Sequence, residues 1–243
     1  MQSFGKGAST ARRRAEEILA LVDRPERELI EQDELVEGRI VIGCGELAAV
    51  QVLPEIIEAF HKKYPLVSYD IFTANADLVK EQMEKGLIDI GVLLEPIDME
   101  KFDFIRLTGK ERWVVLMRPE DPLAEKEAVS AKDLENLPLI LPRRTNVQNE
   151  LLNWLGDSFQ STKVLFTSNL STNGAIMVQR GLAYSIAIEG SVPFWDKEKI
   201  TYRPLYPELT ANSVLAWKKQ QPFTLAADKF IEHLKCLLGI SNI

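Results

Sequence analysis

The stretch Gly43–Ala48 reads Gly-Cys-Gly-Glu-Leu-Ala and joins an apolar run to an amphipathic one. Its spacing matches G-x-G-x-x-A, the turn with which dinucleotide-binding folds hold a pyrophosphate, and Asp70 follows at about the distance of a ribose-binding acid. Against that interpretation, the helical pattern begins only near Val50, and Asp70 falls inside its strand instead of at the strand's end. The other interpretation is a tight glycine turn that exposes backbone N–H groups at a helix start, where an anion or a polar ligand binds.

Cys44, within that turn, is the candidate nucleophile of the chain, because a helix N-terminus lowers the pKa of a thiol. No histidine lies close to it in the sequence to act as a base, so lining a ligand cleft is the stronger hypothesis. His61 and His233 stand outside any motif, and the chain holds no nucleophile elbow, phosphate loop or HExxH helix. The sequence therefore predicts no catalytic residue, no metal site and no cofactor.

Charge and cysteine content narrow the class of protein. The 243 residues include 29 Lys and Arg against 36 Asp and Glu, a formal net charge of -7. A chain this acidic is a poor nucleic-acid binder on its own, because neutralising phosphates needs a basic face. No run of about 18 uncharged apolar residues exists, and no apolar signal core follows the N-terminal arginines, so neither a membrane partner nor export is expected. Cys44 and Cys236 lie too far apart for a disulfide framework or a zinc spacing, which suits the cytoplasm.

The elements that must position these groups follow from the apolar pattern. From Gly38 onward, short apolar runs alternate with amphipathic stretches, which is the order of a mostly parallel sheet with helices on its faces. We expect strands at 39–43, 67–72, 88–93, 113–117, 139–141, 164–167, 183–187 and 213–217. We expect helices around 53–60, 77–85, 131–135, 147–155 and 173–180, and a last helix from Pro222. Two such units predict two lobes with a ligand cleft beyond the carboxyl ends of the strands.

Polar residues follow several of these strands. Thr73 and Asn75 come after the second strand, Glu95 after the third, and Arg143 after a strand of the second unit. The segment 167–172 leads into a helix, with Ser171 or Thr172 suited to cap it. Each segment alone is more typical of a turn or a cap than of a binding site. If two lobes close on each other, however, these strand ends converge from opposite sides.

The N-terminal part of the chain has a different pattern. Positions in alternating steps of four and three are occupied mainly by apolar residues among charged ones: Ala11, Ala15, Ile18, Val22, Leu29 and Val36, with Pro25 and Gln32 filling the two remaining positions. That narrow seam predicts a helix that packs on a partner helix, with a plain surface helix as the alternative. Pro25 lies inside the pattern and should kink or split the helix.

Taken together, the ordered motifs resemble the effector domain of LysR-type transcriptional regulators. The resemblance rests on these segments, in this order: Gly38–Gly43, Leu53-Pro54 with Phe60 and Tyr64-Pro65, Gly86–Val92, Arg118–Ala124 and Val178–Ala183. It covers about Ala15 to Leu238, and although the single motifs are loose, their order and spacing together are specific. Ala74 stands where the family often has glycine, and Pro25 interrupts the family's linker helix.

The resemblance implies an α/β fold of two Rossmann-like lobes with a central cleft, like type 2 periplasmic binding proteins. Residues 1–36 would form a leader and linker helix, 37–112 with 212–243 the first lobe, and 113–211 the second lobe. It also implies a homo-oligomer, dimer or tetramer. DNA would be bound only through a winged helix-turn-helix that precedes the linker and is absent from these residues, which leaves open whether the chain is truncated or naturally headless.

Carried over by position, the resemblance also implies a ligand pocket. Its residues would be Cys44, Gly45, Glu46, Leu47, Thr73, Asn75, Leu94, Glu95, Leu141, Arg143, Asn169, Leu170 and Ile188. Helix N-termini and Arg143 suit a small carboxylate, whereas Glu46 and Glu95 argue against a multiply charged anion. We therefore expect a singly charged or zwitterionic effector.

These observations predict a sensor that is not an enzyme, in which ligand binding between the lobes alters a DNA-binding oligomer. The alternative is a solute-binding protein of a transport system with the same fold, which the missing export signal disfavours. An enzyme that uses Cys44 as its nucleophile is a third hypothesis.

Overall fold

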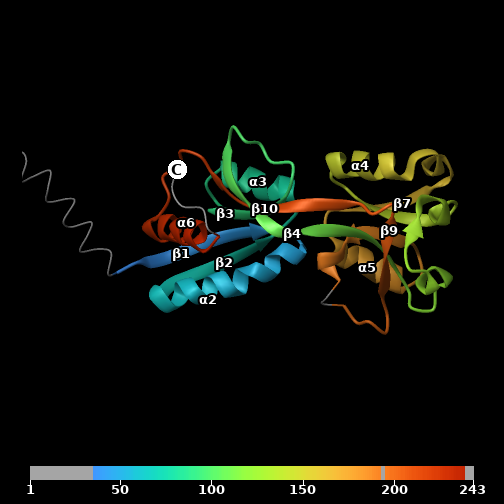
Figure 1. Cartoon of the computed structure of the whole chain (residues 1–243), viewed down its shortest axis with the longest axis horizontal. Coiled ribbons are helices and arrows are strands. Elements are labelled where there is room, and N and C mark those ends of the chain that lie inside the picture. Colours follow the sequence, from blue (N-terminus) through green and yellow to red (C-terminus); the bar gives the residue numbers. More distant parts are fainter. Residues whose placement is uncertain (1–34, 193–194, 239–243) are drawn as a thin grey trace, which may run out of the picture.

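The computed structural model of the chain describes residues 35–192 and 195–238. Two α/β lobes lie end to end and are joined by long strands that run between them (Figure 1). The predicted α/β class with two lobes is confirmed. The predicted helix of residues 1–36 lies outside the described residues except for Leu35 and Val36.

The first lobe is built on a sheet in the order β2-β1-β3-β10-β4. Its parallel strands are β1 (Glu37–Cys44), β2 (Leu66–Thr73) and β3 (Ile90–Leu94), and the antiparallel strand β10 (Thr210–Lys218) pairs with β3 and β4 (Phe102–Met117). Helices α2 (Leu53–Lys63) and α6 (Leu225–Leu237) pack on one face against residues such as Ile40 and Ile42. Helix α3 (Ala76–Glu84) packs on the other face, where Val79 and Met83 contact Leu93.

The second lobe continues from β4 in the order β4-β8-β6-β7. Strand β6 (Pro138–Pro142) is parallel to β7 (Lys163–Ser168) and to β8 (Tyr184–Ile188), while β8 and β9 (Thr201–Tyr206) are antiparallel to β4, and the short β5 (Val129–Ser130) pairs with β9. Helices α4 (Thr145–Leu155) and α5 (Ser171–Gln179) cover opposite faces. The described residues also form short 3-10 helices in both lobes: η2 (Ala48–Val52), η3 (Pro122–Glu125), η4 (Ala131–Leu134), η5 (Gly156–Ser161) and η6 (Glu189–Ser191).

Strand β4 belongs to both lobes. Residues 102–112 pair with β10, whereas residues 113–117 pair with β8 and β9. The sequence predicted only the second half, because residues 106–110, which lie between the lobes, are exposed or half-buried and show no apolar pattern. Strand β9, with its Arg203-Pro204 pair, was not predicted either. The helix predicted at 131–135 is only the 3-10 turn η4.

Two glycines allow close approaches that set the geometry of the cleft. A Cβ on Gly43 would lie 2.5 Å from a methyl group of Val79, so the glycine lets α3 pack tightly on β1. A Cβ on Gly190 would lie 1.8 Å from the backbone nitrogen of Ala48. The turn η6 of the second lobe therefore rests directly on η2 of the first, with no room for a side chain.

Candidate functional site

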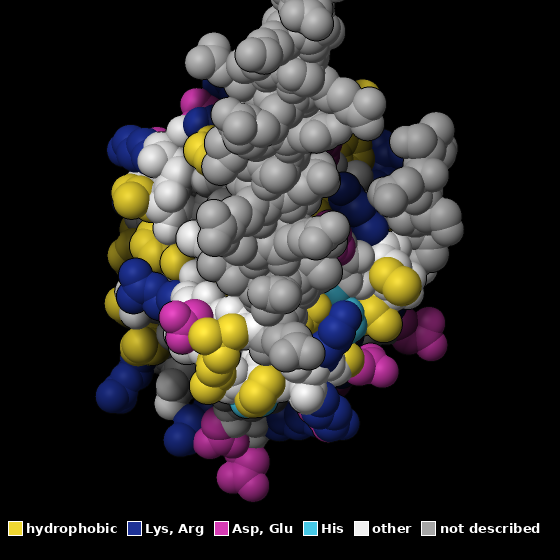
Figure 2. Space-filling model, turned by 90° about the vertical axis from the view of Figure 1, so that its left-hand side faces the viewer, with side chains coloured by type: hydrophobic (Ala, Val, Ile, Leu, Met, Phe, Trp, Pro, Cys, Tyr) yellow, Lys and Arg dark blue, Asp and Glu magenta, His cyan; other side chains and the backbone are white. Residues whose placement is uncertain are grey.

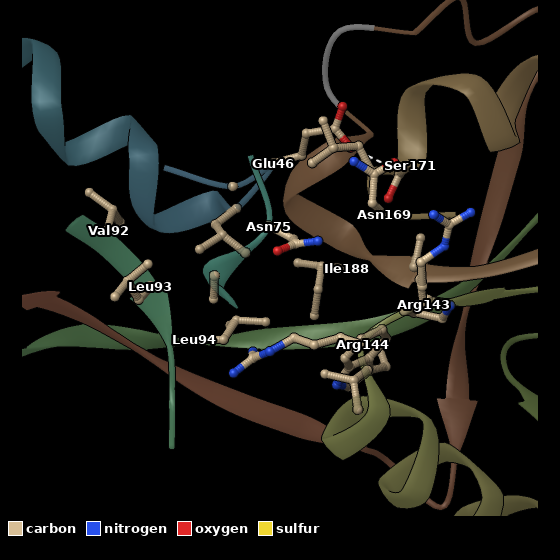
Figure 3. A pocket seen from close by; sticks show the side chains of 18 residues that line it. Glu46, Asn75, Val92, Leu93, Leu94, Arg143, Arg144, Asn169, Ser171 and Ile188 are labelled. Carbon is tan, nitrogen blue, oxygen red and sulfur yellow. Dashed lines mark hydrogen bonds between the residues drawn. The ribbon is translucent and has the colours of Figure 1, made fainter. Parts of the chain in front are cut away.

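The carboxyl ends of strands from both lobes surround one cavity of about 100 Å³ (Figure 3). From the first lobe, the segments that follow β1 and β2 and the end of β3 contribute Gly45, Glu46, Leu47, Asn75, Ala76, Val92, Leu93 and Leu94. From the second lobe, the segments after β6 and β7, the start of α4 and the end of β8 contribute Pro142, Arg143, Arg144, Val147, Asn169, Leu170, Ser171, Ala187 and Ile188. Trp113 lines the cavity from the middle of β4. Ligand sites of open α/β sheets lie at this position, because backbone groups at strand and helix ends are free there.

Most of the residues predicted for the pocket line this cavity: Gly45, Glu46, Leu47, Asn75, Leu94, Arg143, Asn169, Leu170 and Ile188. Cys44, Thr73, Glu95 and Leu141 do not. Cys44 and Leu141 are each 3% exposed and lie in the hydrophobic core. The residues that follow them, Gly45 and Pro142, line the cavity. Thr73 is exposed at the end of the edge strand β2, and the Glu95 carboxylate binds Arg106 and Asn212 instead.

The position of Cys44 also bears on the nucleophile hypothesis. Burial raises the pKa of its thiol, so the neutral form dominates near neutral pH. A helix N-terminus does not offset this burial, since the side chain lies on the core side of β1 among Ile42 and Leu47. No group of three or more His, Cys, Asp or Glu residues within the described ranges could hold a metal ion.

Sequence reasoning missed Arg144, which has the most informative geometry in the cavity. Its side chain is 7% exposed and extends toward Leu94 across the cavity (Figure 3). Its Nε donates a hydrogen bond of 2.9 Å to Oδ1 of Asp77, in the first turn of α3 in the other lobe. Its Nη2 is buried and has no hydrogen-bond partner among the described residues. The pair Arg143-Arg144 was visible in the sequence, but nothing local indicated which of the two is buried.

The ion pair between the lobes changes the acidity of Asp77. Burial raises the pKa of this carboxyl, but the guanidinium of Arg144 and the ammonium of Lys80 outweigh burial and lower the pKa below its usual value. Asp77 therefore stays ionised and binds Arg144 at neutral pH. One edge of the guanidinium is thus neutralised, while its Nη2 has no acceptor.

Trp113 was also missed, and it adds a second donor without an acceptor. The side chain is 3% exposed, and its indole Nε1 is buried without a hydrogen-bond partner in the part of the chain that the structure describes. Asn75 adds a further donor, because its Oδ1 already accepts the backbone N–H of Leu78 and leaves the amide NH2 toward the cavity (Figure 3). The cavity thus has apolar walls and is lined by residues that carry donors without acceptors in the described part of the chain, a combination that suits a ligand with oxygen acceptors.

Glu46 is the acidic residue of the lining, and its carboxylate is already occupied. It accepts the backbone N–H of Ser171 at 2.5 Å and the hydroxyl of Thr172, both in the first turn of α5 in the other lobe. The predicted capping by Ser171 or Thr172 is therefore wrong. The N-cap residue is Leu170, which has no side-chain acceptor, and Glu46 supplies the cap instead.

Comparisons with known proteins agree with this geometry. A family model described as the LysR substrate binding domain matches residues 33–238. The HTH-type transcriptional regulator YvbU of Bacillus subtilis, itself uncharacterised, is 28% identical over 224 residues, which cover 92% of this chain and 75% of that protein. The crystal structure of HinK, a LysR family transcriptional regulator from Pseudomonas aeruginosa, superposes with a TM-score of 0.68 at 22% identity, covering 96% of this chain and 80% of that one. The effector binding domain of QuiR in complex with shikimate gives a TM-score of 0.68 at 16% identity, covering 86% of this chain and 100% of that one.

Proposed function

The chain belongs to the LysR substrate-binding domain family, and on that premise we propose that its cavity binds a small molecule with an apolar body and one acidic group. Proteins of this family are transcriptional regulators that respond to small-molecule effectors, and they are not an enzyme class. The family does not favour the alternative of a transport solute-binding protein. The related QuiR domain, which binds shikimate, shares only the fold at 16% identity, so the ligand class must be argued from this cavity.

The observation that carries the proposal is the pair of buried donors without acceptors, Arg144 Nη2 and Trp113 Nε1. A buried donor left unpaired costs about 1–3 kcal/mol, and more for a charged group, so such groups usually mark a missing partner. A carboxylate supplies acceptor oxygens for both donors and balances the charge of the arginine. The apolar walls formed by residues such as Val92, Leu93 and Ile188 suit a hydrocarbon body.

The size and charge of the cavity limit the ligand further. An apolar cavity of about 150 Å³ holds benzene, so a cavity of about 100 Å³ accepts only a small molecule unless the lobes part. Glu46 lies in the lining and repels a second acidic group. We therefore propose a compact monocarboxylate or a zwitterion and not a dianion.

Ligand binding between the lobes is proposed to act by shifting the population of closed and open arrangements. The first part of β4 pairs with β10 and its last part pairs with β8, which supports a lobe boundary near Arg112. The pairing of β10 with the first part of β4 supports a return of the chain to the first lobe near Asn212. A ligand that contacts both lobes stabilises the closed arrangement by its differential affinity for it. That shift is the signal that a regulator transmits to its other parts.

We propose that the protein acts in the cytoplasm as a homo-oligomer. No helix in the described ranges is long and apolar enough to cross a membrane. Within the described residues, the main path of the sheet ends at β2 and β7, and both strands expose apolar side chains: Ile71 and Phe72 on β2, and Val164 and Leu165 on β7. Exposed apolar edges pair readily with another chain, which supports association of copies through one or both edges.

DNA contact is proposed to come from a region outside these residues. The chain carries a net charge of -7, and basic and acidic side chains are mixed on the visible surface of the first-lobe end (Figure 2). A DNA-binding face needs clustered positive charge to neutralise phosphates.

The test is a thermal melt of the chain against small monocarboxylates, each paired with the amide and the amine of the same carbon skeleton. A carboxylate at 100 times its dissociation constant stabilises the fold by about 2.7 kcal/mol, and the amide and amine should stabilise it far less. Arg144→Gln should abolish the response, whereas Arg143→Gln, which changes the exposed neighbour, should weaken it only partly. Stabilisation by amines alone, or by no compound, would refute the proposal.

A further inference from the structure

Glu46 connects the two lobes through hydrogen bonds to the start of a helix. It lies in the first lobe after β1, and its carboxylate binds the backbone N–H of Ser171 and the hydroxyl of Thr172 at the start of α5 in the second lobe (Figure 3). The N-terminus of a helix carries partial positive charge and free N–H groups, so it attracts anions. An acidic side chain of this chain already occupies that position.

The helix provides no cap of its own, which makes the contact with Glu46 the cap of α5. Leu170 is the N-cap residue and has no side-chain acceptor. By contrast, α3 is capped by its own Asn75 and α6 by its own Thr224. Opening of the lobes would therefore leave the backbone N–H of Ser171 and the hydroxyl of Thr172 without their present acceptor.

Two further features hold the same arrangement without any ligand. Arg144 of the second lobe binds Asp77 of the first with a distance of 2.9 Å between Nε and Oδ1. The turn that contains Gly190 contacts the backbone of Ala48, two residues after Glu46. The contact at Gly190 thus holds the segment that carries Glu46 against the second lobe. The ion pair adds a second link, between Asp77 of α3 and Arg144 at the start of α4.

We propose that Glu46 is a specificity-determining residue that acts as an internal anion, holding the lobes together and excluding any ligand that would place a second acidic group at the N-terminus of α5. The proposal rests on the proposed function in that the effector shares this cleft. Because the Glu46 carboxylate occupies the N-terminus of α5, the acidic group of the ligand binds Arg144 and Trp113 instead.

Backbone hydrogen exchange tests the bridge without a ligand. Glu46→Ala removes the acceptor, and exchange in the segment 169–173 should become about tenfold faster at neutral pH, because opening now costs less. Glu46→Gln keeps an acceptor and removes the charge, so a smaller increase, about threefold, is expected. Glu127→Gln removes the charge of an exposed residue outside the cavity and serves as the matched control. Exchange equal to that of the wild type in both Glu46 variants would overturn the proposal.

Butyrate and succinate test the specificity, since they share a four-carbon chain and differ by one carboxylate. Calorimetric titration of Glu46→Ala should show succinate bound about tenfold more tightly than by the wild type, with butyrate changed less than about threefold. A variant that binds succinate no better than the wild type would overturn the assigned role. Failure of every monocarboxylate on the wild type would instead count against the proposed function, while the exchange measurement would still decide whether Glu46 bridges the lobes.

Discussion

Asp77→Asn perturbs the ion pair between the lobes with little change in shape. Breaking a fully buried ion pair by removing one partner costs about 3–5 kcal/mol, whereas exposed pairs contribute about 0.2–1 kcal/mol. Here the Arg144 side chain is 7% exposed, but that of Asp77 is 54% exposed, so the pair is only half desolvated. The asparagine carbonyl can still accept the Nε–H of Arg144. We therefore expect the free energy of unfolding to fall by about 1–2 kcal/mol at pH 7.

Urea denaturation of the two proteins measures this difference, and Asp70→Asn is its matched control. Asp70 pairs with Arg39 at 3.7 Å, with side chains that are 51% and 66% exposed, so its loss should change stability by about 0.5 kcal/mol or less. If Asp77→Asn destabilises no more than Asp70→Asn, the inter-lobe pair contributes nothing measurable and the reasoning from burial fails.

The pH dependence of the same difference provides a second check. The folded protein holds the pKa of Asp77 below the usual 3.8 of an aspartate. The contribution of a carboxyl with a lowered pKa is present above the unfolded value and is lost as the pH falls through the folded value. The difference in the free energy of unfolding between the wild type and Asp77→Asn should therefore be constant from pH 7 to about pH 5 and shrink below pH 4. A gap that stays the same at pH 3 would contradict an ionised Asp77.

Further predictions concern packing, tyrosine titration and thiol reactivity. Gly190→Ala should lower the free energy of unfolding by about 1–3 kcal/mol in urea titrations, because the added Cβ would clash with the backbone of Ala48. Gly174→Ala is the control: its Cβ would lie 3.6 Å from the nearest atoms, so the free energy of unfolding should stay unchanged or rise. Burial and a hydrogen-bonded carboxylate raise the pKa of Tyr184 to about 12, so its contribution to stability is present below pH 10 and is lost as the pH rises toward 12. The stability deficit of Tyr184→Phe should shrink over that range in denaturation at stepped pH. A colorimetric thiol reagent should label the exposed Cys236 quickly and the buried Cys44 only on unfolding, and a fast phase that survives Cys236→Ser would contradict the burial of Cys44.

The strand ends that line the cavity were predictable, because each is marked locally. An apolar run that stops at a glycine or a polar residue indicates where a buried strand leaves the sheet, as at Gly45, Asn75 and Arg143. The parallel order of the strands then requires these ends to meet at one edge. Cys44 and Leu141 were assigned to the site one residue too early, since the alternation along a strand sends neighbouring side chains to opposite sides.

Trp113 was predicted within a strand but not within the site. Its position depends on β4 passing between the lobes, and the exposed middle of that strand has no apolar alternation to reveal its course. The sequence therefore indicated two α/β units, but not the continuous strand that brings Trp113 into the lining of the cavity.

The amino-acid sequence by itself determined the fold class, the two lobes and the strand ends, because periodicity, glycine turns and helix starts are properties of neighbouring residues. Only the tertiary structure decided the partners of the charged groups in the cleft. Glu46 caps a helix 125 residues away, and Arg144 binds a carboxylate 67 residues away in the other lobe. Such pairs depend on how the two lobes meet in space, and the residues next to either partner do not indicate a contact so far along the chain.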